Sequence, residues 1–332
     1  MTPGPTAVPG QPTFRLSDVL AARHRIAGTV RRTPLAYSPW LSEAARARVY
    51  LKLESLQLTN SFKIRGALNA VRALVDRDPA PRLVTASAGN HGRALAYAAE
   101  QLGLPLTVFV ARTAPITKLD AIRRHGADLR AVADHYDQTE PLAKAFAAAE
   151  GATFISAYSH PDIVAGAGTI ALEIVEDLPD VDRVVVPVGG GGLVGGIAAT
   201  LHSIAGGRIR VVGVETDASP VFHTSLQAGR LVRIDVRDTI ADGLAGNADP
   251  ETITFDLISR FVERIVLASD ARLREGIRGL VREEHLIAEG AGIAALAALV
   301  AGTIDVRGQN VVVVVSGSNI DADRLSAILA ER

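Results

Sequence analysis

The sequence predicts an α/β protein built from mostly parallel β-sheets. Short apolar strand patterns alternate with helix patterns along most of the 332 residues, which is typical of parallel strands joined by right-handed helical crossovers. Two strand patterns end in small and polar residues, at 189–192 and at 316–319, where open α/β sheets bind their ligands. Because 48% of the residues are hydrophobic, the chain can also fill a large core.

Ordered structure is predicted to begin near Leu16, after a proline-rich, disordered tail at 1–15. Ser17 is expected to cap the first helix. Further helices are predicted at 41–46, 66–76, 93–103, 117–125, 140–150, 164–176, 273–284, 290–300 and from 322 onward. Strands are predicted at 49–53, 82–86, 106–111, 128–133, 183–188, 210–215 and 310–315. Residues 216–262 show no clear periodicity.

The chain has no linker that would divide it in two, but its strand-helix units fall into two groups. The units within 78–158 form a compact group, and the segments on both sides carry the strand patterns of a larger sheet. We therefore predict a large domain made of 16–77 and 159–332, with a small domain at 78–158 inserted into it. Since ligand sites favour such interfaces, we expect the site between the two domains.

Charge and composition limit the partners that the protein can have. With 35 basic and 36 acidic residues the net charge is −1 and no basic block occurs, so neither a nucleic acid nor a membrane partner is predicted. Cysteine is absent, which excludes disulfides, thiolate nucleophiles and cysteine-bound zinc. The start lacks the regions of a signal peptide, and the apolar run at 291–301 is too short to cross a bilayer. The sequence thus predicts a cytoplasmic protein that binds small neutral or zwitterionic ligands.

Lys63 is the first candidate functional residue. It lies in the stretch SFKIRGA at 61–67, between a strand pattern and a helix pattern, so both sides of it are held by regular structure. Most lysines at helix starts are simply solvated cations. A second stretch changes this interpretation: a glycine run at 189–192 follows a strand and precedes a helix of small residues.

The glycine run is suited to binding a phosphate. Without side chains, successive backbone N–H groups can converge on an anion at the start of the next helix. A lysine combined with such a cradle indicates a covalently held phosphorylated aldehyde. A dinucleotide site stays open as an alternative, because Glu215 ends a strand further on, although that site needs the spacing Gly-x-Gly-x-x-Gly.

Two further stretches follow strand patterns. The stretch at 87–91 precedes a helix, whose free N–H groups suit a carboxylate, and the amide of Asn90 can hydrogen-bond a ring hydroxyl. Its alternative is an ordinary helix cap with an incidental histidine. Ser316 directly follows a run of five valines and is therefore expected at the carboxyl edge of the sheet. Its alternative is a plain polar turn.

These four stretches, in this order, resemble the fold type II (tryptophan synthase β-like) pyridoxal-phosphate enzymes, and in particular their threonine/serine dehydratase and serine racemase branch. The resemblance covers 16–330 and implies the cofactor pyridoxal 5′-phosphate and a homodimer. It also implies that Lys63 forms the Schiff base and takes the Cα proton, that Asn90 meets the ring 3-oxygen, and that Ser316 faces the pyridine nitrogen. The other implied cofactor-binding residues are Phe62, Gly189, Gly190, Gly191, Gly192 and Leu193. The implied substrate-carboxylate site is Ser87, Ala88, Gly89, Asn90 and His91.

The implied reaction is the elimination of water from a β-hydroxy amino acid such as L-threonine or L-serine, which gives a 2-oxo acid and ammonia. A serine beside the ring nitrogen does not keep that nitrogen protonated, so the ring is a weak electron sink. Prompt loss of a β-leaving group is then favoured over a long-lived carbanion.

The sequence departs from the pattern of these relatives at several positions. Ala88 stands where racemases carry a second serine, the acid/base on the opposite face. No acid follows Glu215 at the spacing of the metal-dependent dehydratases, so no metal site is predicted. Gly290 and Ser318 stand near the expected pocket where relatives often have Pro and Gly.

Four alternatives to threonine/serine dehydration remain. They are a dehydratase of a bulkier 3-hydroxy amino acid, of the hydroxyectoine-pathway or phenylserine type, a serine racemase, a β-replacement enzyme of the same fold, and a non-catalytic or dinucleotide-binding protein.

Overall fold

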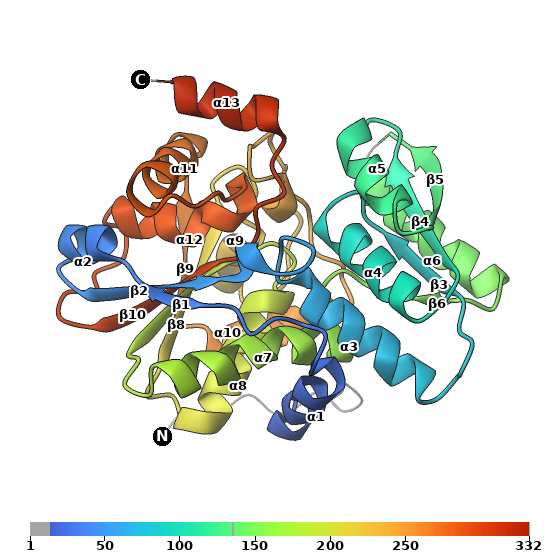
Figure 1. Ribbon diagram of the computed structural model, residues 1–332, viewed down its shortest axis with the longest axis horizontal. Helices are drawn as coiled ribbons and strands as arrows, with labels where there is room; N and C mark the ends of the chain where they lie inside the picture. Colours follow the sequence, from blue (N-terminus) through green and yellow to red (C-terminus); the bar gives the residue numbers. More distant parts are fainter. Residues whose placement is uncertain (1–13, 135, 332) are drawn as a thin grey trace.

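The computed structural model describes residues 14–134 and 136–331. The predicted disordered tail at 1–15 lies outside the described residues, apart from Phe14 and Arg15. The described chain forms two sheets that stand side by side (Figure 1). The larger has six strands in the order β1-β2-β10-β7-β8-β9, and the smaller has four in the order β5-β4-β3-β6.

The strands of the larger sheet are β1 Leu35–Tyr37, β2 Arg48–Leu53, β7 Arg183–Pro187, β8 Arg210–Thr216, β9 Arg264–Ala268 and β10 Asn310–Val315. Those of the smaller sheet are β3 Leu83–Ala86, β4 Leu106–Ala111, β5 Asp128–Ala133 and β6 Thr153–Phe154. The pairing of β1 with β2 is antiparallel, and the other pairs are parallel. The predicted α/β class with mostly parallel sheets is therefore confirmed.

The helices are α1 Leu16–Ile26, α2 Pro39–Ala45, α3 Lys63–Val75, α4 Asn90–Gln101, α5 Ile116–Arg123, α6 Tyr136–Ala149, α7 Pro161–Asp177, α8 Gly192–Ala205, α9 Val221–Ala228, α10 Thr254–Phe261, α11 Asp270–Glu284, α12 Gly290–Val300 and α13 Ala322–Ala330. Two short 3-10 turns, η1 Glu54–Leu56 and η2 Asp242–Leu244, complete the described elements. Among these helices, none combines the length and the apolar character that crossing a bilayer requires.

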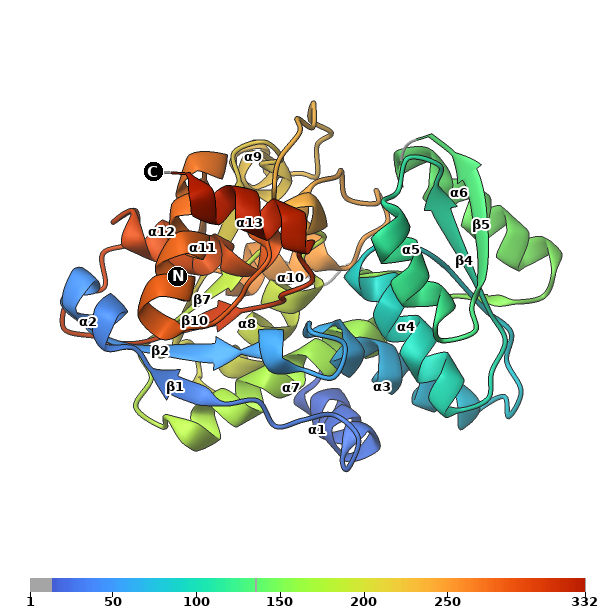
Figure 2. The same ribbon diagram turned by 45° about the horizontal axis from the view of Figure 1, so that its top comes forward.

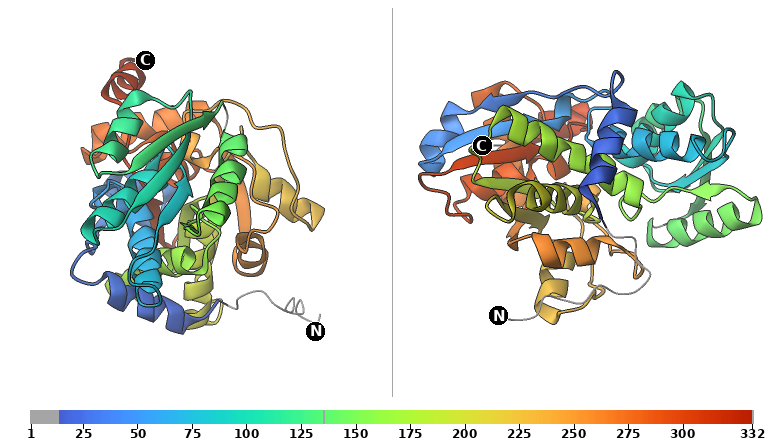
Figure 3. Two further views of the ribbon diagram at one scale, coloured as in Figure 1. Left: turned by 90° about the vertical axis from the view of Figure 1, so that its right-hand side faces the viewer. Right: turned by 90° about the horizontal axis from the view of Figure 1, so that it is seen from below.

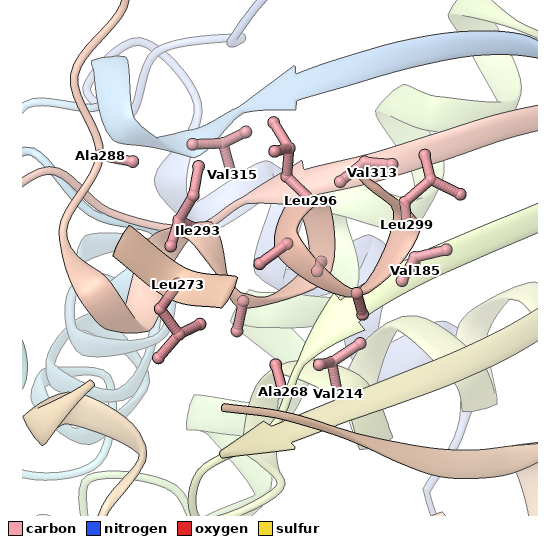
Figure 4. Close-up of a cluster of buried hydrophobic side chains, with 14 of the residues drawn as sticks. Val185, Val214, Ala268, Leu273, Ala288, Ile293, Leu296, Leu299, Val313 and Val315 are labelled. Carbon is pink, nitrogen blue, oxygen red and sulfur yellow. The ribbon is translucent and has the colours of Figure 1, made fainter. Parts of the chain in front are cut away.

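Helices cover both faces of the larger sheet. On one face α12 packs against the central strands, and Ile293, Leu296 and Leu299 meet valines of β7, β8 and β10 (Figure 4). On the other face, apolar residues of α7 and α8 form a second cluster with the same strands, and α1 packs on the outer side of α7 (Figure 3). Burying each large aliphatic side chain stabilises the fold by roughly 1.5–3 kcal/mol, so the central strands and α12 form a rigid base.

The smaller sheet is also covered on both faces (Figure 2). Along β4, Val108 and Val110 belong to the cluster with α3 and α4, while Phe109 points into a cluster with α6, as the two-residue period of a strand requires. The strands of this sheet, β3 to β6, follow one another in the sequence. The strands before and after them belong to the larger sheet. The domain boundaries at 78 and 158 stay a prediction.

Several details of the sequence interpretation are wrong, among them the cap of α1 and the starts of α3, α4, α6, α7 and α11. Ser17 does not cap α1, because the helix already includes Leu16, Arg15 is the N-cap position and no side chain caps it. Helix α4 begins at Asn90 instead of residue 93, one turn closer to the β3 strand end. Helix α6 begins at Tyr136 instead of residue 140, although Pro141 lies inside it.

Candidate active site

A cavity of about 680 Å³ lies between the two sheets. Its walls include the first turns of α3 and α4, the glycine turn before α8 and the turn after β10. The predicted site residues that line it are Phe62, Lys63, Ser87, Ala88, Gly89, Asn90, His91, Gly189, Gly190 and Ser316. Gly191, Gly192 and Leu193 are not among the lining residues, and the side chain of Leu193 packs in the core. Segments far apart in sequence thus converge on one space.

Lys63 is the first residue of α3 and faces this cavity. The loop before it is tied to the turn after β10, because the Phe62 N–H donates to the Ser316 carbonyl at 3.0 Å. The Lys63 ammonium donates to the Ala157 carbonyl at 2.9 Å. Burial lowers the pKa of Lys63 to about 8, and the opposite charge of Glu289 resists that fall. The Lys63 amine is therefore neutral far more often near neutral pH than the amine of an ordinary lysine.

The other lysines of the chain form ion pairs. The sequence contains four, Lys52, Lys63, Lys118 and Lys144. Lys52 is buried and pairs with Glu173 at 2.6 Å, Lys118 pairs with Asp242, and Lys144 pairs with Asp249. Lys63 forms no ion pair with any residue that the structure describes, so it is the amine best placed to react with a carbonyl.

A buried group of four charges lies under the first turn of α3. The Arg65 guanidinium bonds both carboxylate oxygens of Glu54 at 2.8 Å and reaches Glu173 at 2.6 and 2.9 Å. Lys52 donates to Glu173 and to the Thr33 carbonyl. Two positive and two negative groups balance, and they join β2, η1, α3 and α7. We call Lys52, Glu54, Arg65 and Glu173 the four-charge cluster, and it fixes the helix that carries Lys63.

The glycine turn at 189–192 leaves no room for side chains. An added Cβ would lie 2.9 Å from the Gly243 carbonyl at Gly189, 2.3 Å from the Tyr158 ring at Gly190 and 2.7 Å from Ile258 at Gly191. Gly191 also has φ +85°, which L side chains rarely adopt. Within the described chain, the N–H groups of residues 189–191 have no backbone acceptor. Together with the positive end of α8, they fit a phosphate.

The turn between β3 and α4 forms another wall of the cavity. Gly89 donates to the Ser87 hydroxyl at 3.2 Å, and helix α4 starts with Asn90 and His91. The His91 Nε2 lies 3.3 Å from the Ile155 carbonyl, and burial together with Lys63 lowers the pKa of His91 to about 3. His91 is therefore neutral, and its Nε2 carries the proton. The free N–H groups at the start of α4 can bind a carboxylate.

Glu289 is a site residue that the sequence interpretation missed. It precedes α12, lines the cavity, and its Oε1 accepts a hydrogen bond of 2.6 Å from the Asn90 amide. Asn319 donates to the Asn90 carbonyl oxygen at 2.6 Å, and Arg93 donates to Asn319 at 2.6 Å. In the sequence, the one feature that could have indicated Glu289 is that an acidic residue directly precedes an apolar helix that begins with small residues.

The remaining predicted residues surround the cavity. Ser316 lines it and is 5% exposed. Gly290 and Ser318 lie next to it without lining it. An added Cβ at Gly290 would come within 2.2 Å of the Ile240 carbonyl, and the Ser318 hydroxyl turns to the Ser55 carbonyl at 3.0 Å. Neither departure from the relatives' pattern therefore changes the cavity wall directly.

Glu215 has a structural role in this fold. Its two oxygens accept the N–H groups of Phe222 and His223 at 2.8 Å each, at the start of α9. Burial raises the pKa of Glu215 to about 8, against these two hydrogen bonds. Within the described residues, no three His, Cys, Asp or Glu side chains are grouped to hold a metal ion.

The fold and the cavity together define a class of protein: an α/β enzyme that joins a phosphorylated aldehyde to a lysine. The lysine, the phosphate-sized glycine turn and the carboxylate-binding helix start share one cavity, and pyridoxal 5′-phosphate has the groups that fit them. The chain belongs to the pyridoxal-phosphate-dependent enzyme family, whose model matches residues 26–317. This finding shows the cofactor and excludes the dinucleotide alternative.

Comparison with individual relatives indicates which branch of this family the chain resembles. The chain is 39% identical to the L-threonine ammonia-lyase of Thermotoga maritima over 95% of its own length and 78% of the relative. It is 36% identical to the catabolic L-threonine dehydratase of Escherichia coli, over 94% and 95% of the two chains. Among solved structures, maize serine racemase matches with a TM-score of 0.89 at 27% identity, covering 95% of this chain and 96% of that one. The fold type II resemblance is therefore confirmed.

Proposed function

We propose that this enzyme is a threonine/serine-type ammonia-lyase, which removes water from a β-hydroxy amino acid. The substrate loses its Cα proton and its Cβ hydroxyl, and the product takes up water and releases ammonia to leave a 2-oxo acid. The observation that carries the proposal is Lys63, which lines the cavity without an ion pair to any described residue and has a pKa lowered to about 8, in a chain similar to threonine ammonia-lyases over nearly its whole length.

Each wall of the cavity has a part in this reaction. When bound, pyridoxal phosphate supplies the electron sink that weakens the Cα–H bond. The N–H groups of the glycine turn and α8 would hold its phosphate, Asn90 would meet its ring oxygen, and Ser316 would face its ring nitrogen. The turn before α4 and the first residues of α4, together 87–91, would hold the substrate carboxylate. The contacts of Phe62 and Asn90 within the fold support these positions.

Lys63 is the proton acceptor at Cα. To take that proton, the Lys63 amine would have to be free and neutral. Burial favours this neutral form by lowering the pKa of Lys63 to about 8, and the bond from Lys63 to the Ala157 carbonyl holds the nitrogen at the cavity wall. The same residue can then return a proton during product release.

Racemisation is the second candidate, favoured by the likeness to maize serine racemase. It needs a proton donor on the face of the substrate opposite Lys63. Ala88 lines the cavity and its methyl group has no proton to give, which supports elimination instead. A bulkier 3-hydroxy amino acid is the third candidate, since a cavity of about 680 Å³ leaves room beside the cofactor.

The remaining proposals concern the state of the protein. We propose that it works in the cytoplasm as a homodimer, with a small domain at 78–158 inserted between 16–77 and 159–332. The two-sheet arrangement supports the insertion.

A substrate panel tests the proposed function. The purified holoenzyme is incubated with L-threonine, L-serine and bulkier 3-hydroxy amino acids, and the 2-oxo acid and the ammonia are measured separately. We expect equal amounts of both from L-threonine or L-serine, and D-serine only after the change Ala88→Ser. A wild-type enzyme that yields no 2-oxo acid from any member of the panel would refute the proposal.

A further inference from the structure

Glu289 is a buried carboxyl group that the proposed reaction does not use. It is 7% exposed, yet it lines the same cavity as Lys63. The chain makes room for it: a Cβ on Gly317 would lie 2.2 Å from the Glu289 Oε1. The Glu289 N–H also donates to the Gly317 carbonyl at 3.1 Å. Burying a carboxylate costs folding free energy. The position of Glu289 in the cavity therefore calls for a functional explanation.

Glu289 orients the side chain of Asn90. The Asn90 amide donates one N–H to Glu289 at 2.6 Å, and its oxygen accepts from Asn319 at 2.6 Å. Asn319 is itself held by Arg93 at 2.6 Å and by the Thr59 carbonyl at 3.0 Å. Because an amide nitrogen has two protons, one N–H of Asn90 remains for a ligand, in a direction fixed by this chain of contacts.

Glu289 also acts on Lys63 through its charge. Its negative charge raises the pKa of Lys63, against the larger effect of burial. Burial and Asp242 of η2 raise the pKa of Glu289 itself to about 7, while Lys118 of α5 and hydrogen bonds from Asn90 and the Asn319 backbone oppose the rise. Arg93 of α4 also faces it. The pKa values of Glu289 and Lys63 therefore both lie near neutral pH.

We infer that Glu289 is a positioning residue: its ionised carboxylate keeps the nitrogen of Lys63 protonated in the linkage with the cofactor and points Asn90 at the cofactor ring oxygen. A protonated nitrogen there would make the cofactor more reactive toward the substrate amine. The inference rests on the proposed cofactor chemistry of this cavity, and it does not depend on which 3-hydroxy amino acid is the substrate.

A purely structural role is the competing explanation, in which Glu289 only joins α12 to the turn at 317–319. Glu289→Gln separates the two, because glutamine keeps the shape and the acceptor for Asn90 but removes the charge. Glu289→Asp keeps the charge and shortens the reach to Asn90. Asp321→Asn is the matched control, since Asp321 also lines the cavity but bonds Thr117 at 2.9 Å instead of Asn90.

The test is a pH titration of the visible absorption of each holoenzyme without substrate. For Glu289→Gln we expect the spectral pKa to fall by roughly 0.5–1 unit, and kcat to fall about tenfold while the cofactor stays bound. Glu289→Asp should keep the spectral pKa near that of the wild type and lower kcat, and Asp321→Asn should leave the spectral pKa unchanged. A Glu289→Gln spectrum that titrates like the wild type, or an equal shift in Asp321→Asn, would overturn the inference.

A second variant covers the case in which Glu289→Gln does not fold. Asp242→Asn removes the exposed charge that raises the pKa of Glu289, so Glu289 should ionise at lower pH and the acid limb of kcat should move to lower pH. An unmoved acid limb would contradict the inference.

The inference and the proposed substrate can fail separately, because the spectral titration contains no substrate. A wild-type enzyme that shows the visible band but acts on no 3-hydroxy amino acid would refute the proposed substrate alone.

Discussion

Replacing Arg65 by methionine should destabilise the protein strongly, because it breaks the four-charge cluster. Arg65 is 1% exposed and Glu54 is fully buried. Without the guanidinium, Glu54 keeps only the Thr33 hydroxyl at 2.5 Å and Glu173 keeps Lys52 at 2.6 Å. The cluster then carries one uncompensated negative charge in the core.

The expected loss follows from this imbalance. Breaking a buried ion pair while leaving its partner charged costs about 3–5 kcal/mol, which is at least about a fifth of a typical unfolding free energy of about 5–15 kcal/mol. For a chain of this size, about 2 °C are lost for each kcal/mol, so Tm should fall by about 6–10 °C. The loss should also loosen α3 and weaken cofactor capture by Lys63.

Thermal and urea unfolding of the apo-protein measure the effect. The double variant Glu54→Gln with Arg65→Met restores neutrality, so it should be about 1–3 kcal/mol more stable than Arg65→Met alone. Arg112→Met is the control, because the Arg112–Asp134 pair at 3.2 Å is exposed and should contribute less than about 1 kcal/mol. An Arg65→Met variant no less stable than this control would refute the reasoning.

Four shorter predictions concern the cavity and its supports. Gly190→Ala should weaken cofactor binding at least about tenfold, because its Cβ would lie 2.3 Å from the Tyr158 ring; an unchanged Kd by equilibrium dialysis would contradict this. Ser316→Asp should keep the cofactor but slow elimination, and unchanged turnover would show that the contact with the ring nitrogen is unimportant. The rate of cofactor capture by the apo-protein should rise with pH with a midpoint near 8, because burial lowers the pKa of Lys63 to about 8, whereas a midpoint near about 10.4 would indicate an ordinary lysine. Glu215→Ala should lower the unfolding free energy by about 2–3 kcal/mol, because two buried N–H groups of α9 lose their acceptor, and urea unfolding with no change would exclude that capping role.

The sequence was sufficient for the elements with a strong, local pattern. The strands Leu106–Ala111, Asp128–Ala133 and Asn310–Val315 and the helix Gly290–Val300 match their predicted bounds. The strand Asn310–Val315 and the helix Gly290–Val300 are buried along nearly their whole length, so their apolar runs are almost continuous. The local sequence pattern alone was therefore enough to predict the bounds of these elements.

The missed elements depend on distant partners. Strand β1 has only three residues and exists because it pairs with β2. Strand β9 is held by β8, and β6 by β3. Helix α9 is different, because the side chain of nearby Glu215 accepts the N–H groups of Phe222 and His223 in its first turn. For the three strands the stabilising partner is another strand of the fold, which a local pattern cannot reveal.

The candidate site was predictable in part. Lys63, the glycine run, the turn at 87–91 and Ser316 each follow a strand or begin a helix, so their motifs also indicate their place at the sheet edge. Glu289 was missed because its contact with Asn90 spans 199 positions. An acid before a helix is a common solvated residue, and only the packed structure shows it to be buried in the cavity.

The most direct test of the account is to find which lysine holds the cofactor. The holoenzyme is reduced with borohydride and digested, and the peptides are analysed by mass spectrometry. We expect the added mass of the reduced cofactor on Lys63 alone among the four lysines of the chain, together with loss of the visible band in Lys63→Ala. An adduct on Lys52, Lys118 or Lys144, or a visible band that persists in Lys63→Ala, would contradict the account.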